Sequence, residues 1–309
     1  RLVPSGIGAR APAAGAIRHS QERHSKETVM KVAVCMFSTD YTLGIVPLAQ
    51  QVEALGFESL WLPEHPLIPV DFSTPYAGGG PLPDYYRHSL DPFAALAAAA
   101  AATTKLRLGT GICLLAERNP LIVAKEVATV DLISGGRFEL GVGAGWLKEE
   151  GDLFKVDWPH RWAQTKDHVL ALKALWGPHP SQYQGRYVQV PPVWCNPKPV
   201  QKPNPPVLIA GELEQCTRRV AEYGDGWIPR ARNMKPQDLE QGRKHMEAAL
   251  RQAGRDPAPF RISLFAAPPK RESNRQFADA GCDRVIHMLP VEEPAKTRER
   301  LKALAADVL

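Results

Sequence analysis

Short apolar runs and longer amphipathic stretches alternate along this chain, and the alternation is clearest between residues 105 and 146. Residues 105–113 predict a buried strand, and Gly109 and Gly111 within it suggest that something flat approaches closely. Apolar residues then recur at helical spacing over 120–134, and the run RFELGV at 137–142 predicts the next strand. The segment is therefore interpreted as two parallel strands joined by one helix.

This predicted helix has clear start and stop signals. Asn119 supplies an N-cap side chain, and Pro120 occupies the first helical position, where its missing N–H costs nothing. Gly135 supplies a left-handed stop. The Gly-Ala-Gly sequence at 143–145 follows the second strand, so the backbone there is expected to come close to a ligand.

Strands and helices alternate strictly along most of the chain, with eight predicted strands. This pattern predicts an α/β fold, a closed (β/α)8 TIM barrel that forms one domain over residues 30–309. Two interruptions stand out: a polar loop at 66–90, and an excursion at 147–206 between strands four and five, with a helix at 163–176 and a hairpin at 182–190. The predicted strands cover residues 31–37, 58–62, 105–113, 137–142, 207–210, 225–229, 261–266 and 284–288.

Composition and charge exclude several classes of protein. The net charge of +5 is modest for 309 residues and scattered, which disfavours nucleic acid as a partner. The five cysteines lie far apart with no Cys-x-x-Cys pair, so we expect neither disulfides nor a metal site, and a cytoplasmic location fits. No apolar run is long enough to span a membrane. Residues 1–29 lack periodicity and a signal-peptide core, and we expect a disordered N-terminal extension.

The candidate chemistry lies just past the predicted strands. In a TIM barrel the active site is at the carboxyl ends of the strands, where His65, Gly111, residues 143–146 and Gly211 are found. An imidazole can donate or accept a proton near neutral pH, so His65 is the candidate acid–base group. The competing interpretations are a histidine that is merely satisfied at a strand end and an ordinary strand-to-helix turn at Gly211.

Three stretches of sequence carry a family resemblance. They are LGTGICLLAERNPLIVAKEVATVDLISGGRFELGVGAGWLKEE at 108–150, NPKPVQKPNPPVLIAG at 196–211 and YGDGW at 223–227. They resemble the luciferase-like flavin monooxygenase superfamily, and most closely its branch that uses the deazaflavin coenzyme F420. The resemblance extends over residues 30–309 and implies the same eight-stranded barrel with an excursion between strands four and five.

The resemblance implies roles for individual residues. It implies a cis peptide bond between Gly111 and Ile112, where a bulged backbone would lie against the flat ring of the cofactor; an ordinary β-bulge is the alternative. It also implies that His65 lies beside the reactive ring carbon and that the amides around Gly211 hold phosphate. The cofactor-binding residues that it implies are Glu64, Thr110, Gly111, Ile112, Gly143, Ala144, Gly145 and Gly211.

The chain departs from the family pattern at several positions. Trp146 stands where relatives that oxidise a sugar phosphate carry a glutamate, which disfavours that reaction and favours an apolar or planar substrate; simple packing is the alternative. Glu212 places an acid near the implied phosphate. Glu64 replaces a commoner aspartate, and Leu114 and Glu149 stand where relatives place polar cofactor contacts.

The resulting hypothesis is a coenzyme F420-dependent oxidoreductase that transfers a hydride between the deazaflavin and a small organic substrate, with His65 handling the proton. The alternative keeps the fold but binds FMN and acts as a monooxygenase with reduced flavin and oxygen. A non-catalytic barrel that carries a flavin-like ligand is a third hypothesis. A Schiff-base enzyme is disfavoured because Lys105 lies at the opposite end of strand three. Relatives are commonly dimers, so a homodimer is an expectation.

Overall fold

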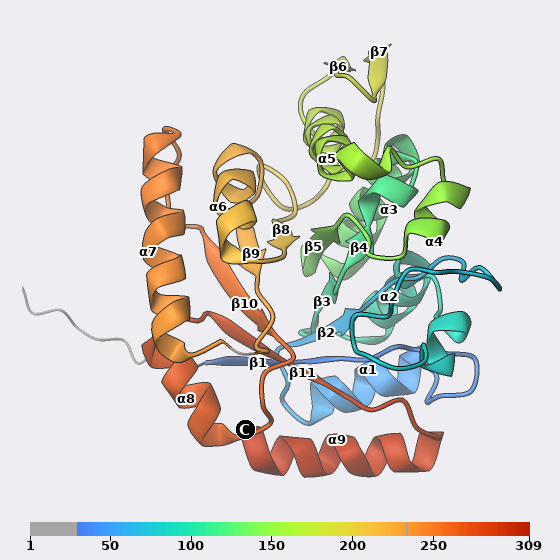
Figure 1. The fold of residues 1–309 in the computed structure, drawn as a ribbon, viewed down its shortest axis with the longest axis vertical. Helices are drawn as coiled ribbons and strands as arrows, with labels where there is room; N and C mark the ends of the chain where they lie inside the picture. Colours follow the sequence, from blue (N-terminus) through green and yellow to red (C-terminus); the bar gives the residue numbers. More distant parts are fainter. Residues whose placement is uncertain (1–29, 233) are drawn as a thin grey trace, which may run out of the picture.

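A closed barrel of parallel strands forms the centre of the chain, as the alternation of strands and helices predicts (Figure 1). The computed structural model describes residues 30–232 and 234–309, so the extension predicted at 1–29 lies outside the described residues. The cylinder closes because β1 pairs in parallel with both β2 and β11. The barrel strands are β1 (Lys31–Cys35), β2 (Ser59–Leu62), β3 (Arg107–Thr110) continued by β4 (Cys113–Leu114), β5 (Phe138–Gly143), β8 (Val207–Ala210), β9 (Gly226–Ile228), β10 (Arg261–Phe265) and β11 (Arg284–Met288).

Helices surround the strands, and local signals define their ends. At α3, the Asn119 side chain accepts a hydrogen bond from the amide of Leu121, Pro120 is the first helical residue and Gly135 has φ of 65°. All three predicted signals are therefore confirmed. The helices that follow barrel strands are α1 (Ile45–Ala54), α2 (Pro92–Ala102), α3 (Pro120–Ser134), α6 (Leu213–Glu222), α7 (Pro236–Gln252), α8 (Arg271–Asp279) and α9 (Pro294–Val308). None of the helices among the described residues is both long and apolar enough to cross a lipid bilayer.

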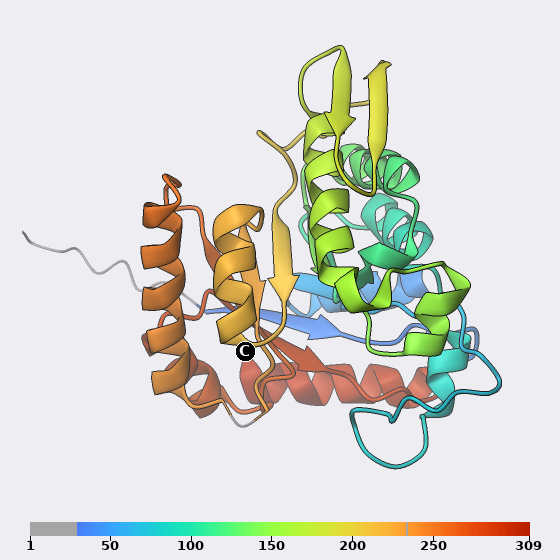
Figure 2. The same cartoon turned by 45° about the horizontal axis from the view of Figure 1, so that its top comes forward.

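The excursion between β5 and β8 contains more structure than the sequence predicts. It has the expected long helix and antiparallel hairpin, and the hairpin rises beyond α5 at one end of the molecule (Figure 2). The short helix α4 was not predicted, and it lies beside the segment between β2 and α2 (Figure 1). The elements of these two connections are α4 (Lys148–Leu153), η3 (Trp158–His160), α5 (Arg161–Trp176), β6 (Ser181–Gln184), β7 (Gln189–Val193) and η1 (Asp84–His88).

The third strand is broken rather than continuous. It stops at Thr110, passes through a cis peptide bond between Gly111 and Ile112, and resumes as β4. The flat group that approaches Gly109 belongs to the protein itself: a Cβ at Gly109 would lie 2.5 Å from ring atoms of Trp61. The prediction that Gly109 makes room for a ligand is therefore wrong, because the Trp61 ring fills that space inside the barrel.

We expect Gly109→Ala to lower the free energy of unfolding by about 1–3 kcal/mol, because over-packing a filled core forces its neighbours to move. The Trp61 indole cannot swing away easily, since it is fully buried and donates a hydrogen bond to Ser59 Oγ at 2.8 Å. Urea denaturation measures the change. Gly44→Ala is the control, because a Cβ there meets nothing closer than 3.8 Å. Equal stability of the Gly109 variant and the wild type would contradict the packing argument.

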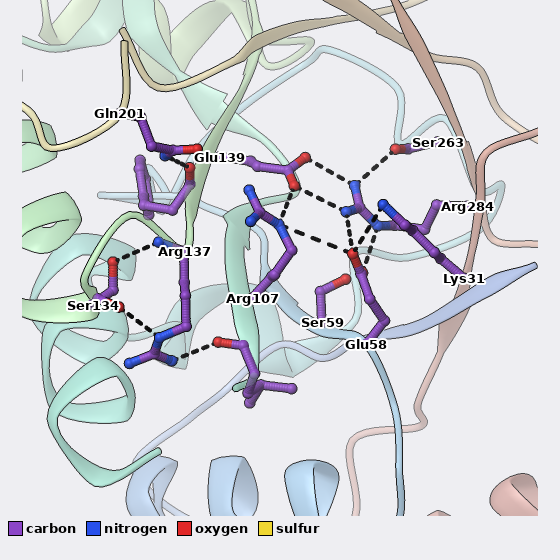
Figure 3. Close-up of polar contacts among 12 residues, drawn as sticks. Lys31, Glu58, Ser59, Arg107, Ser134, Arg137, Glu139, Gln201, Ser263 and Arg284 are labelled. Carbon is purple, nitrogen blue, oxygen red and sulfur yellow. Dashed lines mark hydrogen bonds and ion pairs between the residues drawn. The ribbon is translucent and has the colours of Figure 1, made fainter. Parts of the chain in front are cut away.

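The amino ends of the strands are closed by a network of buried charges (Figure 3). Arg284 lies between the carboxylates of Glu58 and Glu139, and it donates hydrogen bonds of 2.7–2.9 Å to both. Arg107 donates a further bond of 2.7 Å to Glu139. Lys31 lies 3.9 Å from Glu58, so two acids face three bases in this cluster. The network forms a polar floor to the barrel, opposite to the end where the candidate site lies.

Candidate active site

His65 follows β2 at the carboxyl end of the barrel and is held by two side chains. Its Nδ1 lies 2.6 Å from Glu150 Oε2, and the indole N–H of Trp146 donates to its Nε2 at 3.2 Å. An indole nitrogen is only a donor, so Nε2 must be the acceptor and Nδ1 must carry the ring proton. His65 is only 8% exposed. The two partners therefore select one neutral tautomer, with the proton directed at Glu150.

Glu150 is a candidate site residue that the sequence does not predict. It lies in the first turn of α4 and is fully buried. Its second oxygen, Oε1, accepts a hydrogen bond of 3.3 Å from the amide of Leu67, in the same connection as His65. The available signal is the acidic pair at 149–150, shortly after the glycine loop and Trp146. Because α4 is not predicted, the sequence does not indicate which residues these two acids contact.

Aromatic rings cover His65. The Tyr86 ring centroid lies 4.8 Å from that of His65, and the Trp146 centroid lies 5.8 Å from it. Tyr76 completes the group, with ring centroids 5.5 Å from Tyr86 and 5.7 Å from Trp146. These rings leave one apolar surface around the imidazole. Trp146, predicted to line a substrate pocket, is thus placed beside the candidate acid–base group.

Glu149 fastens the long connection between β2 and α2 onto α4. It accepts hydrogen bonds from the amide and hydroxyl of Ser73 at 2.8 and 2.9 Å, and from the amide and hydroxyl of Thr74 at 3.2 and 2.6 Å. The Thr74 hydroxyl and the Ser73 amide lower the pKa of Glu149 to about 2. The acidic pair at 149–150 therefore holds both His65 and the segment that carries Tyr76.

The residues around the break in strand three pack against the end of β5, and their role in cofactor binding stays a prediction. The cis bond at Gly111–Ile112 is confirmed. A Cβ at Gly143 would lie 1.9 Å from Cδ1 of Ile112, so the glycine makes room for this side chain. The Thr110 hydroxyl donates to the carbonyl of Gly141 at 2.7 Å, which ties the strand end to β5. Ala144 is buried in the loop that follows β5.

Glu64 is directed toward Arg118. Its carboxylate accepts a hydrogen bond of 2.7 Å from Arg118 Nε, and the same guanidinium also bonds to Asp91 at the start of α2. Burial raises the pKa of Glu64, and the charge of Arg118 acts in the opposite direction. In this arrangement Glu64 secures the segment next to His65, and its role in cofactor binding stays a prediction.

A cavity with two arginines lies at the carboxyl ends of β8 and β9. The predicted phosphate-binding amide of Gly211 is already engaged, since it donates to the carbonyl of Ile228 at 3.3 Å. The neighbouring cavity has a volume of about 440 Å³. Its charged groups have no ion pair within 4 Å among residues 30–232 and 234–309. It is lined by Glu212, Arg230, Arg232, Met234 and Asp238.

One arginine of this cavity influences the aromatic group over His65. Burial raises the pKa of Tyr86, and the positive charge of Arg230 acts against that rise. Arg230 follows β9, whereas Tyr86 belongs to the connection after β2. The cavity therefore combines two arginines with the two acids Glu212 and Asp238, and the role of Gly211 in binding phosphate stays a prediction.

Comparison with known proteins places the chain in a family. The model of the family described as luciferase-like monooxygenase matches residues 18–306. The uncharacterized protein Rv0953c of Mycobacterium tuberculosis is 34% identical over 284 residues, which are 90% of this chain and 99% of that protein. The pyrimidine monooxygenase RutA of Allorhizobium ampelinum is 31% identical over 194 residues, or 60% of this chain and 51% of that protein.

Solved structures share the fold at lower identity. The monooxygenase RslO1 from Streptomyces bottropensis matches with a TM-score of 0.68 and 22% identity, over 90% of this chain and 98% of that one. The coenzyme F420-dependent tetrahydromethanopterin reductase from Methanopyrus kandleri matches with a TM-score of 0.66 and 16% identity, over the same shares. A protein named as a monooxygenase and one named as a coenzyme F420-dependent reductase therefore share this barrel fold.

Proposed function

Because this chain belongs to the luciferase-like monooxygenase family, we propose that it is a coenzyme F420-dependent oxidoreductase that transfers a hydride between the deazaflavin and a small organic substrate. The observation that carries the proposal is the state of His65. Glu150 accepts a hydrogen bond from the Nδ1–H group, so Nε2 is the nitrogen that can accept or return a proton. His65 follows β2 at the carboxyl end of the barrel, which is also the end at which the third strand is broken.

The residues present fit such a cofactor. Arg230 and Arg232 would hold its anionic part, and the backbone at Gly111–Ile112 would lie against its ring. When bound, the deazaflavin would supply the hydride chemistry.

The protein's own contribution is proton control and exclusion of water. Trp146 must release Nε2 before His65 can exchange a proton with a substrate, because the indole N–H occupies that nitrogen. Glu150 stabilises the positive charge that develops on the imidazole. The rings of Tyr76, Tyr86 and Trp146 give the site an apolar wall, which favours a planar or apolar substrate.

An FMN-dependent monooxygenase is the second candidate, favoured by the relatives and neighbours that are named as monooxygenases. Titration of the purified protein with coenzyme F420 and with FMN, followed by absorbance and fluorescence, separates the two. We expect binding of the deazaflavin in the micromolar range. Binding of FMN with none of the deazaflavin would reverse the order, and binding of neither would remove both.

His65→Ala tests the acid–base assignment. We expect it to retain cofactor binding but to lower turnover by about 100-fold or more, as for loss of a general acid–base group. His88→Ala is the matched control, because this histidine pairs with Asp40 near the surface. Unchanged turnover in the His65 variant would remove the imidazole from the mechanism.

A further inference from the structure

Glu117 is a buried acid that the proposed mechanism leaves unused. It ends the short turn η2 (Leu115–Glu117), directly after β4 at the carboxyl end of the barrel. The residue is only 5% exposed. Neither carboxyl oxygen has a hydrogen-bond partner in the described part of the chain. A buried polar group without a partner is costly, so its presence beside a candidate site calls for a physical reason.

The carboxyl of Glu117 is packed against the glycine loop that leads to Trp146. A Cβ placed on Gly145 would lie 2.8 Å from Glu117 Oε1, and Gly145 has φ of 77°. The ionisable groups that face Glu117 are Glu150 from α4, Glu64 from the segment after β2, and Arg118 next to it in the chain. Glu117 is therefore packed against the loop whose next residue, Trp146, bonds to His65, and the charge of Glu150 acts on it.

The hydrogen-bond donors decide which of the adjacent acids carries a charge. Glu150 accepts from His65 and from the amide of Leu67, and Glu64 accepts from Arg118. Arg118 also donates to Asp91, and none of these donors reaches Glu117. A carboxyl without donors in a dry site is more stable when protonated. Burial, then the charges of Glu150 and Glu64, raise the pKa of Glu117 to about 9.

We propose that Glu117 is a positioning residue for His65: it keeps a proton at neutral pH, so that it adds no further negative charge beside the Glu150–His65 pair. The inference deepens the proposed function, since it concerns the same histidine. If Glu117 ionises, a second negative charge appears next to Glu150, and the imidazole binds its proton more tightly. The imidazole of His65 would then still accept a proton, but it would return that proton less readily.

The first test follows the ring nitrogens of His65 by ¹⁵N NMR in the protein without cofactor. In the wild type we expect Nδ1 to be protonated at pH 7 and the ring signals to shift again as Glu117 loses its proton near pH 9. Glu117→Gln should remove this alkaline shift, whereas Glu240→Gln, an exposed acid on α7, should keep it. An alkaline shift that persists in the Gln variant, or that is absent from the wild type, overturns the proposal.

The second test uses stability. The pKa of Glu117 is about 9 in the folded state against an ordinary 4.5, so the folded state binds more protons between these values. The free energy of unfolding therefore falls as pH rises through this interval. The Tm of Glu117→Gln minus that of the wild type should grow from pH 5 to pH 9, and Glu117→Met should show the same trend. A constant difference would overturn the proposal. Neither test uses a cofactor, so each stands apart from the titration with F420 and FMN.

Discussion

Glu150→Gln is expected to lower the rate of the proposed hydride transfer by about 100-fold, the scale of a lost contribution to acid–base catalysis. Gln can still accept the Nδ1 proton of His65, but it has no negative charge to stabilise an imidazolium. Its amide can also rotate and donate to Nδ1, which would favour the wrong tautomer of the ring. The wild-type contact of 2.6 Å between two buried side chains makes this loss large.

The measurement has two parts, so that a folding defect is not mistaken for a catalytic one. Absorbance of the cofactor gives the rate with a substrate that the wild type turns over, and ¹⁵N NMR reports which nitrogen of His65 holds the proton. Asp152→Asn is the matched control, since it lies on the same helix and pairs with Lys148 at the surface. A Glu150 variant with wild-type rate and an unchanged tautomer would show that this carboxylate only supports the fold.

Local rules explain why most of the barrel could be predicted. The N-cap, proline and glycine signals of α3 each act within a few residues, and the structure confirms all three. The strands at 207–210 and 284–288 also have the predicted bounds. At the third strand, the break at Gly111–Ile112 was implied only by the resemblance, because spacing alone allowed an ordinary bulge.

The candidate site was predicted less completely because its contacts join distant parts of the chain. His65 and Glu150 are 85 residues apart in the sequence. The hydrogen bonds from Ser73 and Thr74 to Glu149 join residues that are 76 and 75 positions apart. Helix α4 has only six residues and no side-chain cap, so no local signal announced it. Gly109 shows the opposite error, since a residue suited to a ligand makes room for Trp61 instead.

The charged floor of the barrel is expected to contribute strongly to stability. Arg284 is almost fully buried and makes four hydrogen bonds to Glu58 and Glu139, with a fifth to Ser263 Oγ at 3.1 Å. Its guanidinium also lies over the Trp61 ring, 5.2 Å from the centroid. Burial raises the pKa of Glu139, but the charges of Arg284 and then Arg107 overcome this effect and hold the pKa at about 2.

Arg284→Met should therefore lower the free energy of unfolding by about 3–5 kcal/mol, because removing one partner leaves buried carboxylates uncompensated.

The dependence of the free energy of unfolding on acidic pH gives an independent test of the same network. In the wild type the contribution of Glu139 is present above its ordinary pKa of 4.5 and is lost as pH falls toward 2. Without Arg284 the pKa of Glu139 rises toward its ordinary value, so the loss of stability between pH 4.5 and pH 2 should be smaller in the variant than in the wild type. Urea denaturation between pH 3 and 7 measures both effects, and Arg300→Met, which breaks an exposed pair with Glu292, should change stability by less than about 1 kcal/mol. Equal losses in the two variants would mean that burial does not set the strength of this network.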